Sequence, residues 1–127
     1  MNNEIGSRVW VIPDGFIPAR SSGSLESHEA ICILNCNDKA ARIDVTVYFE
    51  DRAPLGQIRI ELEGQRTKHV RTDLLEKDGN KIPKGIPYAL KVESDRNVVV
   101  QFSRMDTTQA ENTLMTTMAY AVQTGKG

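Results

Sequence analysis

The stretch that decides the fold is Ala41-Arg42-Ile43-Asp44-Val45-Thr46-Val47-Tyr48-Phe49-Glu50, in which apolar and polar side chains alternate. On an extended chain, Ile43, Val45, Val47 and Phe49 fall on one face and the polar residues fall on the other. This period of two is typical of a strand with one buried face. Similar apolar runs lie before and after it, at residues 7–12, 29–34, 57–62, 88–93 and 97–104.

Turn-forming residues separate these runs. Pro13-Asp14-Gly15 predicts a turn after the first run, and Ser94-Asp95-Arg96 predicts a hairpin between the last two. Residues 72–76 predict a single helical turn, capped by Thr72 or Asp73 because their side-chain oxygens accept from the first free amides.

The C-terminal third is less regular. We expect a long loop at residues 78–87, a helical turn at 107–110, a strand at 112–121 and a short flexible tail at 124–127. About seven or eight short strands at this spacing are typical of a β-sandwich or a jelly-roll-like barrel. The sequence therefore predicts one all-β domain over residues 1–127.

Composition narrows the class of protein. The net charge of the 127-residue chain is −1 and its basic residues are spread out, which argues against a general nucleic-acid binder. The N-terminus has no basic segment followed by an apolar run, so it does not resemble a signal peptide. No run approaches the about 20 apolar residues that cross a bilayer. We therefore expect a soluble, cytoplasmic protein.

The chemistry-bearing residues do not predict an enzyme. The sequence has no nucleophile elbow, glycine-rich phosphate loop or HExxH helix, and no carboxylate pair is set apart for acid–base work. A metal site would need His28, Glu29 and His69 to converge, and metal-binding jelly rolls carry more histidines. Cys32 and Cys36 are too far apart along one strand to bond, so we expect two reduced thiols with Cys32 in the core. No cofactor and no bound metal are expected.

A polar cluster follows three consecutive valines near the C-terminus, which themselves favour a buried strand. Gln109 and Asn112 suit a hydroxyl-rich ligand such as a sugar, because each amide both donates and accepts. Arg104 either contacts the same ligand or pairs internally with Asp106 or Glu111.

A basic segment from Arg66 to Arg71 has the same character. On a strand, Thr67, His69 and Arg71 share one face, and Arg66 lies on the other. His69 and Arg71 suit an anionic or hydroxylated ligand, or the carboxylates of a partner. Alternatively, these charges protect an exposed edge strand.

Three further residues, His28, Glu29 and Trp10, each have two interpretations. His28 and Glu29, at the start of a strand, either bind a ligand or hydrogen-bond the neighbouring loop. Trp10 is either a core residue or a platform for a sugar ring. The candidate ligand- or partner-binding residues are therefore His28, Glu29, Arg66, His69, Arg71, Arg104, Gln109 and Asn112.

Four segments carry a resemblance to a known family. They are Trp10-Val11-Ile12-Pro13-Asp14-Gly15-Phe16-Ile17-Pro18, Ser27-His28-Glu29-Ala30-Ile31-Cys32-Ile33-Leu34-Asn35, Arg66-Thr67-Lys68-His69-Val70-Arg71 and Gln109-Ala110-Glu111-Asn112. In order and spacing they resemble the sensory rhodopsin transducer family, from about Gly6 to Tyr120. The resemblance implies a small cytoplasmic β-sandwich, similar to carbohydrate-binding modules, that assembles as a homotetramer.

The resemblance also implies a role in signalling. The namesake of the family docks on the cytoplasmic side of a light-sensing membrane protein, and a sugar-like small-molecule ligand is implied for the family. Many members occur without a rhodopsin, which implies a soluble ligand or a different partner as their role. Our hypothesis is a non-enzymatic, signal-transducer-like protein that recognises a small polar, sugar-like ligand, a partner such as a sensory rhodopsin, or both. Two alternatives stay open: a structural or protein-docking module without a small ligand, and a DNA-binding regulator that acts through the basic segment.

Overall fold

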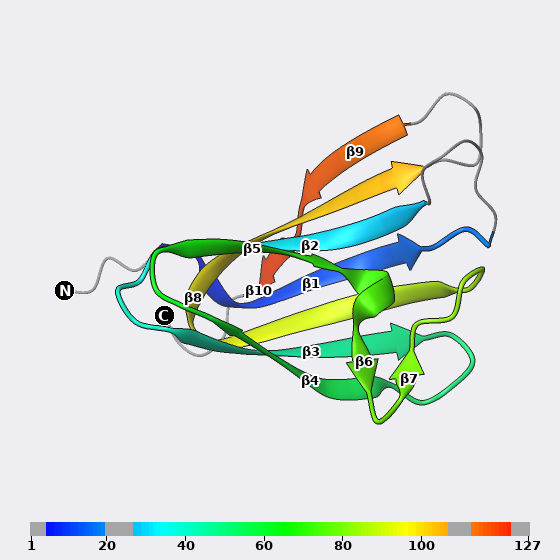
Figure 1. Ribbon diagram of the computed structural model, residues 1–127, viewed down its shortest axis with the longest axis horizontal. Coiled ribbons are helices and arrows are strands. Elements are labelled where there is room, and N and C mark those ends of the chain that lie inside the picture. Colours follow the sequence, from blue (N-terminus) through cyan, green and yellow to red (C-terminus); the bar gives the residue numbers. More distant parts are fainter. Residues whose placement is uncertain (1–4, 20–26, 107–112, 123–127) are drawn as a thin grey trace.

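Long antiparallel strands in two layers make up the computed structural model, which describes residues 5–19, 27–106 and 113–122 (Figure 1). Its elements are β1 (Ser7–Phe16), β2 (His28–Asn35), β3 (Ala41–Phe49), β4 (Leu55–Leu62), β5 (Arg66–Arg71), the 3-10 helix η1 (Thr72–Leu74), β6 (Glu76–Lys77), β7 (Asn80–Lys81), β8 (Pro87–Asp106), β9 (Thr113–Met118) and β10 (Tyr120–Val122). The predicted all-β sandwich is confirmed. Within these ranges, no helix has the length and apolar character to span a membrane.

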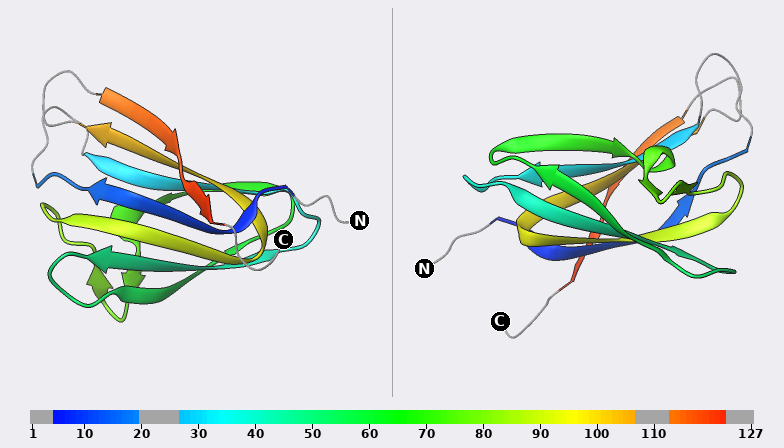
Figure 2. Two further views of the ribbon diagram at one scale, coloured as in Figure 1. Left: turned by 180° about the vertical axis from the view of Figure 1, so that it is seen from behind. Right: turned by 60° about the horizontal axis from the view of Figure 1, so that its bottom comes forward.

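The 20-residue strand β8 belongs to both layers. Its first half pairs with β1 and β3, and its second half pairs with β2 and β9. The first sheet therefore runs β4-β3-β8-β1-β10 and the second sheet runs β5-β2-β8-β9, with every pairing antiparallel. Figure 2 shows β8 curving as it passes from one sheet to the other.

The hairpin predicted at Ser94-Asp95-Arg96 is wrong, because the chain bends there without reversing. β8 exchanges its partner β3 for β2 within this bend. Ser94 Oγ accepts the backbone N–H of Arg96 within the bend at 3.2 Å, and two other polar groups of the bend bond to the segment that begins β3. Asp95 Oδ1 accepts the backbone N–H of Arg42 at 2.8 Å, and Arg96 Nε donates to the carbonyl of Ala40 at 3.0 Å.

The turn predicted at Pro13-Asp14-Gly15 is also wrong, because β1 continues to Phe16. Its ladder with β8 shifts register between Ile12 and Gly15 and then resumes. Gly15 is buried, and a Cβ at this position would lie 2.5 Å from the ring of Tyr88. Proline and glycine here mark an irregularity inside a strand, where the backbone approaches another side chain closely.

Two other boundaries differ from the sequence prediction. Part of the predicted loop at 78–87 is the β6–β7 hairpin, in which Asp78 and Gly79 adopt the positive φ angles of a tight turn. The strand predicted at 112–121 is divided at Ala119 into β9, which pairs with β8, and β10, which pairs with β1. The helical turn predicted at 107–110 and the tail at 124–127 lie outside the described residues.

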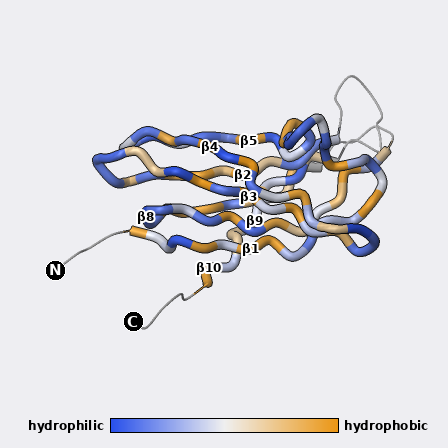
Figure 3. Tube along the Cα trace, turned by 90° about the horizontal axis from the view of Figure 1, so that it is seen from below, coloured by the Kyte–Doolittle hydropathy of each residue, from blue (hydrophilic) through white to orange (hydrophobic). Residues whose placement is uncertain are grey.

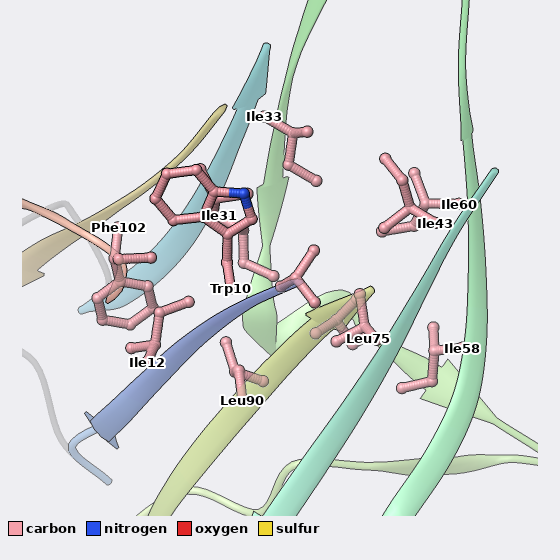
Figure 4. Packing of buried hydrophobic residues seen from close by; sticks show 14 of the residues in the cluster. Trp10, Ile12, Ile31, Ile33, Ile43, Ile58, Ile60, Leu75, Leu90 and Phe102 are labelled. Carbon is pink, nitrogen blue, oxygen red and sulfur yellow. The ribbon is translucent and has the colours of Figure 1, made fainter. Parts of the chain in front are cut away.

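The core lies between the inner faces of the two sheets (Figure 4). Hydrophobic and hydrophilic residues alternate along the strands, so that one face of each sheet is apolar (Figure 3). Trp10 is 6% exposed, and its indole N–H donates to the carbonyls of Ser7 and Val98 at 3.0 Å each. It is therefore a core residue and not a ligand platform. The inward-facing residues predicted on β3 and β4 are buried at Ile43, Val45, Val47, Ile58, Ile60 and Leu62, and Phe49 is partly buried.

Cys32 does not lie in the core, contrary to the sequence prediction. Ile31 and Ile33 take the inner face of β2, and the alternation of the strand therefore turns Cys32 outward. Cys32 is half-buried on the outer face of the second sheet, and Cys36 is exposed; both are free thiols.

Candidate functional site

Glu29 is the most deeply buried charged residue described, at 1% exposure on the inner face of β2. Its Oε1 accepts the backbone N–H of Phe16 at 2.9 Å and the hydroxyl of Tyr88, and its Oε2 accepts Nε of Arg104. The hydroxyl of Thr72 lies 2.8 Å from that of Tyr88 and donates to the Glu29 carbonyl at 3.3 Å. These residues form the Glu29 network, which ties β1, β2, η1 and both halves of β8 together.

The strand register explains why Arg104 takes this partner. Glu29 and Arg104 are directly opposed on β2 and β8, the arrangement in which cross-strand charge pairs form. The internal pairing predicted for Arg104 therefore exists with Glu29; the partners predicted from the sequence were Asp106 and Glu111. The side chains of those two acidic residues lie outside the described part of the chain.

Burial dominates the electrostatics of the network. It raises the pKa of Glu29 above its ordinary value, although the hydrogen bond from Tyr88 and the positive charge of Arg104 oppose this shift. Burial and the nearby Glu29 charge also raise the pKa of Tyr88 strongly, so its hydroxyl remains a donor at neutral pH. The cap predicted from Thr72 is absent, because its hydroxyl bonds within the network; no side chain caps η1.

A groove of about 550 Å³ opens between β1 and β9, and Arg104 is one of its lining residues. Its volume falls within the roughly 300–1,000 Å³ of small-molecule sites. Most of its wall is apolar, and the Arg104 side chain is 28% exposed. The lining residues are Val11, Ile12, Pro13, Asp14, Phe102, Arg104, Met115, Thr116, Thr117, Met118, Ala119 and Tyr120.

A second surface is the outer face of the second sheet. The register places His69, Cys32, Gln101 and Met118 in one cross-strand row, and His28 in a row with Met105 and Leu114. Arg71 lies on the same face, as the strand pattern predicts, and its guanidinium binds both carboxylate oxygens of Asp73. Leu34, Met118 and Leu114 are 41%, 54% and 66% exposed on this face.

Comparison with known proteins adds an independent line of evidence. The sequence profile of the family described as Anabaena sensory rhodopsin transducer matches residues 5–121. The chain belongs to this transducer family. The resemblance carried by the four segments is thereby confirmed.

Two solved structures of high similarity agree with the transducer-family assignment. The crystal structure of Thermotoga maritima 1070 is 41% identical with a TM-score of 0.83, over 93% of this chain and 97% of that one. The Anabaena sensory rhodopsin transducer is 37% identical with a TM-score of 0.70, over 78% of this chain and 98% of that one. No relative was found among curated proteins.

The candidate residues of this transducer-family chain lie in separate places. Glu29 and Arg104 meet in the buried network, whereas His28, His69 and Arg71 lie on the outer face. Arg66 lies at the far end of β5, opposite Asn35, where it is exposed and donates to the carbonyl of Gln65 at 3.1 Å. The last two candidates, Gln109 and Asn112, lie outside the described residues.

The convergence of His28, Glu29 and His69 that a metal site would need does not occur, because neighbouring residues of β2 point to opposite faces. In the ranges that the structure describes, no three histidine, cysteine or acidic residues come together as metal ligands.

Sequence reasoning missed Tyr88, Thr72 and the groove-lining Met115. Tyr88 sits in an apolar run, where an aromatic residue indicates core packing, and its short contact to Glu29 depends on strands far apart in the chain. Thr72 carried a signal for a helix cap, which is a local role. Met115 belonged to a segment whose threonines and methionines left helix and strand both open, so its orientation had no prediction.

Proposed function

We propose that this chain is a non-enzymatic, cytoplasmic signal-transducer-like protein that binds a small polar ligand in the groove and relays its presence to a protein partner. The observation that carries the proposal is that Arg104 belongs both to the groove and to the buried network. Arg104 lines the groove, and its Nε is bonded to Glu29 in the buried network. Membership of the transducer family supports a role in signalling rather than catalysis.

The network supplies the coupling that a transducer requires. Moving Arg104 toward a ligand would weaken its bond to a buried carboxylate, and an uncompensated buried charge is costly. A movement of Arg104 would therefore also shift the residues bonded through this carboxylate, which are Glu29, Phe16 and Tyr88. Because His28 is next to Glu29 on β2 and faces outward, a shift of this strand also reaches the outer face of the second sheet.

The protein partner that we propose is a sensory rhodopsin, the class named in the family description. We assign its docking to the exposed basic edge formed by Arg66, Lys68 and His69 on β5. We propose that copies of this chain meet through Leu34, Leu114 and Met118 on the outer face, in the homotetramer implied by the family resemblance. Exposed apolar residues gathered on one sheet face support such a protein contact.

Thermal-shift and calorimetric titrations with neutral sugars, sugar phosphates and small carboxylates test the ligand. We expect at least one of these classes to stabilise the protein and to bind it, and the variant Met115→Glu, at a 52% exposed groove residue, to bind it more weakly. Gln57→Glu, on the opposite edge of the first sheet, adds the same charge away from the groove and should bind normally. A folded protein that responds to no compound would rule out the ligand.

A second candidate function is a docking module without a small ligand, which the apolar outer face favours. It predicts that Leu114→Glu dissociates the oligomer in sedimentation experiments and that Arg66→Glu and His69→Glu abolish capture of a sensory rhodopsin. Groove variants would then leave both measurements unchanged. Loss of capture in Met115→Glu would instead favour the ligand-coupled function.

A further inference from the structure

The walls of the groove limit the chemistry of its ligand. Among the lining residues, Ile12, Phe102 and Met115 present apolar side chains from the inner faces of their strands, and Thr117 adds a hydroxyl. A neutral sugar placed against such walls would lose water from several hydroxyl groups without gaining partners for them, which is unfavourable. An apolar body would instead gain from the burial of its surface.

Arg104 is the one positively charged residue among the described lining residues. Glu29 occupies its Nε, and no described residue accepts a hydrogen bond from its two Nη atoms. No buried side-chain nitrogen in the described ranges lacks a partner, so these Nη atoms are exposed, and because Arg104 lines the groove we infer that they face it. Their N–H groups form a planar fork that matches the two oxygens of a carboxylate.

The acidic groups nearby do not cancel the positive charge of the Arg104 guanidinium. Glu29 binds Arg104 from the core side, and that bond fixes the direction of the guanidinium. Asp14 is the other charged residue of the lining, but it is exposed on β1, where solvent screens its charge. Direct contact with the guanidinium is therefore the strongest polar interaction that the groove offers.

We propose, as a refinement that rests on the function proposed above, that the groove binds a small carboxylate with an apolar body. The carboxylate lies on the Nη atoms of Arg104, and the body lies between Ile12, Phe102 and Met115. The ligand is an organic acid of this kind and not a free neutral sugar.

Calorimetry with three probes tests the refinement: 3-phenylpropionate, the matched alcohol 3-phenylpropan-1-ol, and glucose. A hydrogen bond to a charged group contributes enough to change affinity at least about tenfold. We expect the acid to bind at least about tenfold more tightly than the alcohol, and glucose to give no heat. Equal affinities for the acid and the alcohol, or tighter binding of glucose, would overturn the refinement.

Variants locate the carboxylate. Arg104→Lys keeps a positive charge beside Glu29 but loses the fork, so binding of the acid should weaken about tenfold while that of the alcohol stays unchanged. Met115→Glu should weaken the acid, and Gln57→Glu should not, with Trp10 fluorescence reporting that each variant is folded. Unchanged affinity for the acid in both Arg104→Lys and Met115→Glu would contradict the assignment.

The two proposals fail separately. If sugars or sugar phosphates bind and carboxylates do not, the refinement is wrong and the ligand-binding function stands. If no sugar, sugar phosphate or carboxylate binds the folded protein, the function and its refinement are both wrong.

Discussion

Replacing Glu29 by alanine tests the buried network on which the binding proposals depend. The change removes the acceptor of the Phe16 N–H, the Tyr88 hydroxyl and the Arg104 guanidinium. Removing one partner of a buried ion pair costs about 3–5 kcal/mol. Arg104 is 28% exposed and regains some water, whereas the Tyr88 hydroxyl retains Thr72 as its only described partner. We therefore expect the free energy of unfolding to fall by about 3–5 kcal/mol, a large part of the about 5–15 kcal/mol of an ordinary domain.

Urea denaturation followed by Trp10 fluorescence measures this loss, because the indole is buried in the folded state. Asp51→Ala is the matched control: it removes a carboxylate that pairs with Arg52 on the surface, and we expect no measurable change. Glu29→Gln keeps an oxygen for Phe16 and Tyr88 and should lose less than alanine. A loss for Glu29→Ala no larger than that for Asp51→Ala would refute the reasoning.

The pKa of Glu29, the packing at Gly15 and the indole bonds of Trp10 can each be tested by one substitution. The folded-state pKa of Glu29 is raised above its ordinary value of 4.5. In urea titrations at several pH values, the stability of wild type relative to Glu29→Gln should therefore be greatest below pH 4.5 and should fall as the pH rises through the folded-state pKa. A rise in this relative stability would contradict the assigned direction of the pKa shift. Gly15→Ala should lower stability by about 1–3 kcal/mol because its Cβ meets the Tyr88 ring. Gly56→Ala is the control and should be tolerated, since the atom nearest to a Cβ there is 3.8 Å away. Equal melting temperatures for the two variants would contradict the overlap at Gly15. Trp10→Phe should cost about 1–3 kcal/mol in circular dichroism melts, because two buried carbonyls lose their indole donor; an unchanged melt would show that these bonds add nothing.

Strand positions were predictable where one face is buried along the whole strand. The alternation over Ala41–Phe49 predicted both the strand and its inward residues, because the side-chain period of a strand is a local property. The same logic predicted that His69 and Arg71 share a face. It failed at residues 94–96, where polar residues that are typical of a turn bend the strand and bond to Ala40 and Arg42 while β8 changes sheets.

The candidate site was predictable only in part. Glu29 and Arg104 were both singled out, but as separate groups with separate partners, since the residues lie 75 positions apart in the sequence. Tyr88 and Thr72 looked like a core residue and a helix cap. Their roles follow from tertiary contacts with Glu29 that sequence periodicity does not contain.

The sequence by itself determined the strand character of the chain, the inward faces of β3 and β4 and membership of the transducer family, because local alternation and short motifs carry that information. Only the tertiary structure decided that β8 joins both sheets, that Glu29 and Arg104 form one buried pair, and that a groove opens beside them. The physical reason is that a pairing register and a cavity are properties of distant segments in contact, whereas alternation within one segment shows only which of its faces is turned inward.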